Sequence, residues 1–159
     1  MDIEGLEIQD DWLWISGSHS LKRDDPDDEG LAGLDDIDWD INRGFLGRLP
    51  LLDRGDGVYE PVGSLELVGH DRRVAAALKL DEDGGKLRRL LQDDPLLGPY
   101  VGLPCKENGL DVEGLAAAGD KVWLGLRGPV LGSLAMIVEL DLKQKRKKPQ
   151  RLKPRKHDG

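Results

Sequence analysis

Short apolar segments separated by turn-forming residues dominate this chain. Alternating or continuous apolar positions favour strands at Leu6–Gly17, Phe45–Leu52, Val74–Leu80, Val122–Leu126 and Leu134–Leu142, with Gly, Pro, Asn or Asp clusters between them. Leucines recur at helical spacing within residues 85–97, and Pro95 limits the end of that helix. We therefore expect a mainly β fold of short antiparallel strands with one short helix.

An internal repeat organises the pattern. The segment DIEGL that begins at Asp2 recurs as DVEGL from Asp111, at an offset of 109 residues, and the match continues to Trp14 and Trp123. Six of the 13 positions from Asp2 to Trp14 are identical, which chance does not explain. A repeated strand, turn and strand with a Trp on the second strand is typical of a propeller blade.

The length of the chain limits the array that such blades can build. A closed propeller needs at least about four blades of roughly 40 to 50 residues each. The 159 residues therefore predict a minimal or partial β-propeller-like array. A partial array leaves open strand edges, which favour self-association.

Each copy of the repeat places two carboxylates on one face. Side chains alternate along an extended segment, so Asp2 and Glu4 project to one side, and Asp111 and Glu113 repeat the arrangement. Paired oxygen donors suit a hard cation, so these four residues are candidate metal ligands, with calcium as the candidate cofactor. The alternative is that the acids cap turns by accepting backbone N–H bonds.

Polar residues around the two copies are candidate ligand contacts. Arg127 follows an apolar strand and precedes Gly-Pro, a position suited to binding the carboxylate or phosphate of a small anionic ligand. An equal alternative is that Arg127 pairs with Glu113 or Asp111 and holds the loops together. Lys106 and Asn108 stand in the polar turn just before the second copy. His19 is expected to line a pocket or to be structural, because adjacent residues of a strand face opposite ways and Ser18 cannot reach it.

Charge is distributed unevenly along the chain. Residues 143–156 hold nine Lys or Arg and no acid, whereas residues 1–142 have a formal net charge of −16. We expect a propeller-like domain at residues 1–142 and a basic C-terminal strand or tail at 143–159. Without aromatic residues between the cations, nucleic acid is an unlikely partner of the tail. An acidic loop of about residues 24–40 holds nine carboxylates and no basic residue, and we expect it to be solvated and extended.

Composition excludes several classes of protein. The single cysteine, Cys105, rules out an internal disulfide and a Cys-based zinc site. The sequence holds no apolar run long enough to cross a bilayer, so we expect no membrane contact. Met1 leads into an acidic segment rather than an export signal, which favours a cytoplasmic location.

Three segments of the chain resemble a family of mostly bacterial proteins called domain of unknown function 3616. The resemblance rests on DIEGL from Asp2, on WISGSHS from Trp14 and on PCKENGLDVEGLAAAGDKVWLGLRGPVL from Pro104. It implies a β-propeller-like array similar to calcium-using hydrolases of the phytase-like kind, and it brings no established reaction. Members of the family look longer at both ends, so the resemblance implies a partial or truncated member.

Three functions follow as hypotheses. The first is a polar ligand- or cation-binding site formed by the duplicated carboxylates with Arg127 and Lys106. The second is a cation-dependent hydrolase of phosphate or other esters, in which a bound cation polarises the scissile group and Arg127 clamps the substrate. The third is a non-catalytic interaction scaffold that uses the open strand edges.

Overall fold

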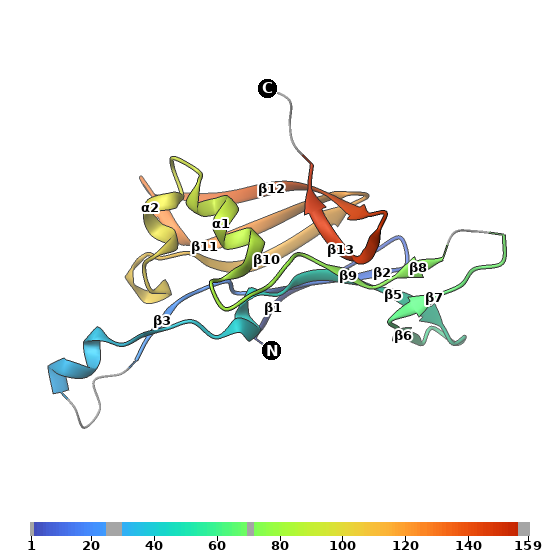
Figure 1. Ribbon diagram of the computed structural model, residues 1–159, viewed down its shortest axis with the longest axis horizontal. Coiled ribbons are helices and arrows are strands. Elements are labelled where there is room, and N and C mark those ends of the chain that lie inside the picture. The colour runs from blue at the N-terminus through green and yellow to red at the C-terminus, as the bar shows by residue number, and fades with distance from the viewer. Residues whose placement is uncertain (1, 25–29, 70–71, 156–159) are drawn as a thin grey trace.

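The computed structural model describes residues 2–24, 30–69 and 72–155 and confirms a mainly β chain (Figure 1). The strands are β1 (Ile3–Gln9), β2 (Trp12–Gly17), β3 (Lys22–Arg23), β4 (Ile37–Asp38), β5 (Leu46–Asp53), β6 (Tyr59–Pro61), β7 (Ser64–Leu65), β8 (Arg73–Val74), β9 (Ala76–Ala77), β10 (Asp111–Ala118), β11 (Lys121–Leu131), β12 (Leu134–Lys145) and β13 (Lys148–Pro154). Short helices join them: α1 (Gly85–Gln92), α2 (Gly98–Val101) and the 3₁₀ turns η1 (Gly30–Asp35), η2 (Ile41–Gly44) and η3 (Cys105–Glu107).

One mixed sheet of nine strands forms a nearly closed, barrel-like body. Its order is β1-β2-β5-β9-β13-β12-β11-β10, and β6 extends the sheet beside β5. Neighbours pair in antiparallel fashion except β13 and β9, which run parallel. The two end strands of this order, β1 and β10, lie against each other. These nine strands thus form one continuous sheet whose two ends meet where the two copies of the repeat lie, while β3 and β4, and β7 and β8, form two separate pairs.

The repeat is structural as well as sequential. In both copies the hairpin has the same register: Leu6 faces Ile15 in β1–β2, and Leu115 faces Leu124 in β10–β11. The pairing also shifts at the equivalent point, between Ile3 and Gly5 and between Val112 and Gly114. Each shift leaves the repeat's glutamate, Glu4 or Glu113, as the extra residue of a β-bulge, the kind of irregularity that re-aims a side chain.

The two hairpins run in the same direction side by side. Gly5 of β1 lies against Leu115 of β10, and further along Gln9 accepts a hydrogen bond from the Gly119 backbone N–H at 3.1 Å. The Val112 N–H also donates to the Ser18 carbonyl at 2.8 Å. The acidic beginnings of both copies are therefore at the same end of the barrel.

The inward faces of the strands supply the core. Trp14 of β2 and Val122 and Leu124 of β11 are fully buried, and the inner face also holds Leu46 of β5 and Leu142 of β12. The alternation that predicted strands thus buries every second residue of β11. Burying apolar area of this kind is the main favourable contribution to folding.

Helix α1 covers the core and confirms the helix expected in residues 85–97. Leu87 and Leu91 of α1 are buried in the core cluster, as is Val101 of α2. The buried Arg88 guanidinium donates at 2.6 Å to the His19 carbonyl and at 2.6 Å to the Val101 carbonyl. Within the residues that the structure describes, no helix is both long and apolar enough to cross a bilayer.

The two charged segments lie apart in the molecule: the described acidic segment extends from the body at one end, whereas β13 of the basic segment packs against the body (Figure 1). The described part of the acidic segment forms η1 and β4, and β4 pairs with β3; residues 25–29 of this segment lie outside the described residues. The basic segment, as far as residue 155, completes β12 and forms β13, which joins β12 to β9. Leu152 of β13 is only 3% exposed, so this strand also contributes to the core.

Candidate functional site

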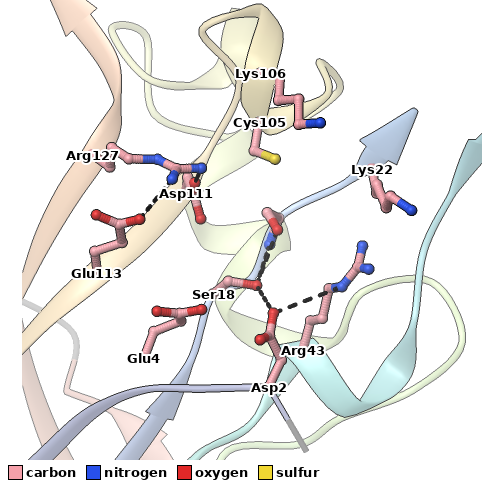
Figure 2. A pocket seen from close by; sticks show the side chains of 11 residues that line it. Asp2, Glu4, Ser18, Lys22, Arg43, Cys105, Lys106, Asp111, Glu113 and Arg127 are labelled. Carbon is pink, nitrogen blue, oxygen red and sulfur yellow. Dashed lines mark hydrogen bonds and ion pairs between the residues drawn. The ribbon is translucent and has the colours of Figure 1, made fainter. Parts of the chain in front are cut away.

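A polar pocket opens where the two copies of the repeat meet. It has a volume of about 190 Å³ and is called here the hairpin pocket. Its lining residues come from the beginnings of both hairpins and from three connecting segments: Asp2, Glu4, Ser18, Ser20, Lys22, Arg43, Cys105, Lys106, Asp111, Glu113 and Arg127 (Figure 2). The pocket therefore joins segments that are about 100 residues apart in the sequence.

The second copy of the repeat holds its own cation. Asp111 begins β10, Glu113 is its bulge residue, and Arg127 lies near the facing position on β11, where Gly128 pairs with Asp111. The Arg127 guanidinium contacts the Asp111 carboxylate through Nη2 and lies 2.8 Å from Glu113 Oε1 through Nη1. Of the two roles considered for Arg127, the structure shows the pairing with the repeat's own acids.

The first copy uses different donors on its aspartate. Ser18 occupies the position that is equivalent to Arg127 at the 109-residue offset, and its hydroxyl donates to Asp2 Oδ2 at 2.9 Å. Arg43 of η2 approaches the same oxygen, with Nε at 3.8 Å. Ser20 adds a hydroxyl 3.0 Å from that of Ser18. Asp2 thus has a hydroxyl donor and a longer ion pair with Arg43 in place of a bridging guanidinium.

Glu4 is the least compensated acid of the pocket. Within residues 2–24, 30–69 and 72–155, no basic side chain lies within ion-pair distance of its carboxylate. Partial burial raises the pKa of Glu4, as do the charge of Asp2, a hydrogen bond with Asp2 and the charge of Glu113, and only Arg127 opposes them. Burial is the largest of these causes, and the neighbouring carboxylates add to it because like charges disfavour the ionised form.

Asp111 also titrates above its ordinary range. The residue is 3% exposed, and this burial raises its pKa to about 6, although Arg127 acts in the opposite direction. The charges of Glu113 and Glu4 add to the increase. The Asp111 carboxyl therefore exchanges its proton near pH 6.

The opposite wall is basic. Lys106 of η3 and Lys22 of β3 lie across the pocket from Glu4 and Glu113 (Figure 2). Lys22 Nζ is 3.7 Å from Asp24 Oδ1, and both side chains are about half exposed, so this ion pair is weak. Cys105 lines the pocket between Lys106 and Arg127. The pocket thus presents carboxylates on one side and cations on the other.

Two candidate residues do not line this pocket. His19 is completely buried directly behind it, with its N–H donating to the Arg43 carbonyl at 2.9 Å and a backbone φ of 54°. Asn108 braces a loop, because its Oδ1 accepts from the Val130 N–H at 2.8 Å. His19 therefore lies between two lining residues, Ser18 and Ser20, and does not line the pocket itself.

The sequence analysis missed Arg43, Lys22, Ser18, Ser20 and Cys105 as lining residues. Ser18 was detectable, because the repeat offset aligns it with Arg127. No pattern in the sequence marks Arg43 or Lys22, which reach the pocket only through the path of the chain between β2 and β5.

The metal hypothesis gains no geometric support. Among the described residues, no group of three or more His, Cys, Asp or Glu side chains is arranged to hold a metal ion. The four carboxylates line one pocket, but Asp111 and Glu113 are engaged by Arg127. Calcium at Asp2, Glu4, Asp111 and Glu113 remains a prediction.

Comparisons with known proteins locate the chain in one family. Searches of curated proteins and of solved structures find no match. The family described as "Protein of unknown function (DUF3616)" matches residues 1–159, which is the whole chain. Because the match spans every residue, including both copies of the repeat that build the pocket, this chain is a member of the DUF3616 family.

Proposed function

We propose that this protein binds a small polar ligand in the hairpin pocket. The observation that carries the proposal is the convergence of both copies of the repeat, with two carboxylates each, on one pocket whose other wall is basic. Asp2 and Asp111 are 109 residues apart, and both are hydrogen-bonded or ion-paired in place. Positioned charged groups in a concave site are typical of ligand recognition.

The charged side chains that line the pocket indicate that its ligand is polar. The lining includes four carboxylates and four cationic side chains, so its formal charges balance. The carboxylates and the two lysines nevertheless lie on different sides of the pocket (Figure 2). An apolar ligand would have to desolvate these charges without replacing their hydrogen bonds, which costs free energy. A small ligand with its own charged groups replaces the lost hydration.

Thermal unfolding with a panel of small ligands tests the proposal. The panel contains calcium, inorganic phosphate, succinate and L-arginine, one representative each of metal, anion, diacid and organic cation. At about 100 times its dissociation constant, a ligand stabilises the folded state by about 2.7 kcal/mol. For a domain of this size, that gain raises the midpoint by roughly 5–10 °C.

Glu113→Gln is the informative variant, because it removes one charge from the pocket while keeping the shape of the side chain. We expect at least one member of the panel to raise the midpoint of the parent protein and to raise it less in Glu113→Gln. Glu82→Gln, at an exposed site outside the pocket, is the matched control and should respond like the parent. If no member of the panel changes the midpoint, or if Glu113→Gln responds fully, the pocket is not the binding site.

A further inference from the structure

The two copies of the repeat form equivalent half-sites of the hairpin pocket. In only one of them does an arginine of the protein bridge both carboxylates. Both hairpins share their register and the position of their bulge, so Asp2 corresponds to Asp111 and Glu4 corresponds to Glu113. The half-sites differ in the residues around these carboxylates and in the backbone at the aspartate. Asp111 pairs with Gly128 inside β10 and is 3% exposed, whereas Asp2 precedes β1 and its side chain is 45% exposed.

In the second half-site a guanidinium bridges the carboxylate pair. Arg127 contacts Asp111 through Nη2 and Glu113 through Nη1, so one guanidinium bridges two carboxylates with one charge-assisted contact to each. The molecule thus contains an example of what this pair of carboxylates binds when a cation is supplied.

In the first half-site the equivalent cation is absent. Residue 18 is a serine, whose short side chain reaches Asp2 but brings no charge. Arg43 comes no nearer than 3.8 Å to Asp2, and within the described part of the chain it forms no ion pair with Glu4. Burial raises the pKa of Glu4, the charges of Asp2 and Glu113 add to this increase, and only the charge of Arg127 opposes it.

We propose that the Asp2 and Glu4 half-site binds the guanidinium or ammonium group of a small organic ligand, in the way that Asp111 and Glu113 hold Arg127. This inference rests on the proposed function and names the class of ligand. The rest of the ligand faces the basic wall, where Lys22 and Lys106 suit a carboxylate or phosphate (Figure 2). The ligand class is therefore a small zwitterion, with its cation toward Glu4 and its anion toward the lysines.

Calorimetric titration with three related compounds tests this proposal. L-arginine has both charged ends, L-citrulline replaces the guanidinium with a neutral urea group of nearly the same shape, and agmatine keeps the guanidinium but lacks the carboxylate. We expect L-arginine to bind at least tenfold more tightly than either analogue, because citrulline leaves Glu4 without a countercharge and agmatine leaves the lysines without one. Equal binding of L-arginine and L-citrulline would overturn the proposal.

Two variants locate the cation. Glu4→Gln should weaken L-arginine binding at least tenfold, whereas Glu82→Gln should leave it unchanged. Ser18→Arg supplies the first copy with the cation of the second, so this variant should abolish the response to L-arginine and raise the midpoint of unfolding. If Ser18→Arg does not fold, the affinity of Glu4→Gln for L-arginine and the comparison of L-arginine with L-citrulline decide whether the half-site binds the cation.

The outcomes separate this proposal from the broader one. If calcium, phosphate or succinate binds in the pocket and L-arginine does not, the pocket is a ligand site but the organic cation is wrong. If L-arginine binds and Glu4→Gln binds it equally well, the cation lies elsewhere, and the proposal again fails.

Discussion

His19 shows how a single buried side chain couples this fold to pH. Burial lowers the pKa of His19 to about 3, and the nearby positive charge of Arg88 acts in the same direction. The folded state therefore holds a neutral imidazole, whereas the unfolded chain binds a proton near the ordinary pKa of 6.5. Stability from this residue is present above pH 6.5 and is lost as the pH falls toward 3.

The expected loss from His19 between pH 7 and pH 5 is about 2 kcal/mol of unfolding free energy. Asp111 acts in the opposite sense: its raised pKa favours the folded state at low pH, and this contribution is lost as the pH rises through about 6. Urea unfolding of the parent and of His19→Asn at both pH values separates the two, because Asp111 is present in both proteins. Asparagine tolerates the positive φ at this site, and an identical pH dependence in the two proteins would contradict the assignment.

At the scale of elements, the pocket depends on the close approach of β1 to β10. A Cβ atom on Gly5 would lie 2.5 Å from the Leu115 Cβ atom, a distance at which one of the two strands must move. The equivalent glycine of the second copy, Gly114, is less restricted, because its Cβ atom would meet the Gly125 Cα atom at 3.3 Å. The glycine shared by both copies therefore serves a close contact mainly in the first.

Gly5→Ala should destabilise the protein by roughly 1–3 kcal/mol through overpacking between the strands. It should also weaken any ligand response of the hairpin pocket, because moving β1 displaces Glu4 relative to Glu113. Gly114→Ala is the matched control and should cost less, as measured by urea unfolding. Equal losses in the two variants would mean that the contact between β1 and β10 does not determine the packing.

At the scale of the whole molecule, β13 holds the barrel together. It is the strand that joins β9, and through it the N-terminal half of the sheet, to β12 and the C-terminal half. Arg151 of β13 pairs with Ala77 of β9, and the neighbouring Leu152 enters the core. The expected boundary between a domain at residues 1–142 and a strand or tail at 143–159 lies within β12, directly after the buried Leu142.

Leu152→Ala tests whether this strand is part of the cooperative unit. If β13 is needed to close the sheet, the substitution should cost about 2–5 kcal/mol of unfolding free energy, the usual range for a leucine removed from a core. Its exposed neighbour provides the control, since Lys153→Ala should change stability by no more than about 0.5 kcal/mol. A separable tail would instead give a small effect for both substitutions in thermal or urea unfolding.

The sequence by itself determined the mainly β class, the short helix in residues 85–97 and the carboxylates of the candidate site. Alternation of apolar residues and turn-forming residues are local signals, and the repeat from Asp2 and Asp111 is visible by direct alignment. The strands and the helix depend on neighbours within a few residues of each other, and the repeat depends only on comparing the sequence with itself. All of these features can therefore be predicted without knowledge of the three-dimensional arrangement.

Only the tertiary structure decided how the pieces meet. The closure of the sheet brings β1 against β10, and it is this contact that converts two separate acidic hairpins into one pocket. Arg43 and Lys22 line that pocket although no pattern in the sequence marks their segments. His19, a candidate pocket residue from the sequence, is buried and does not line the pocket. Pairing between segments about 100 residues apart depends on the packing energy of the whole chain, which no local pattern in the sequence records.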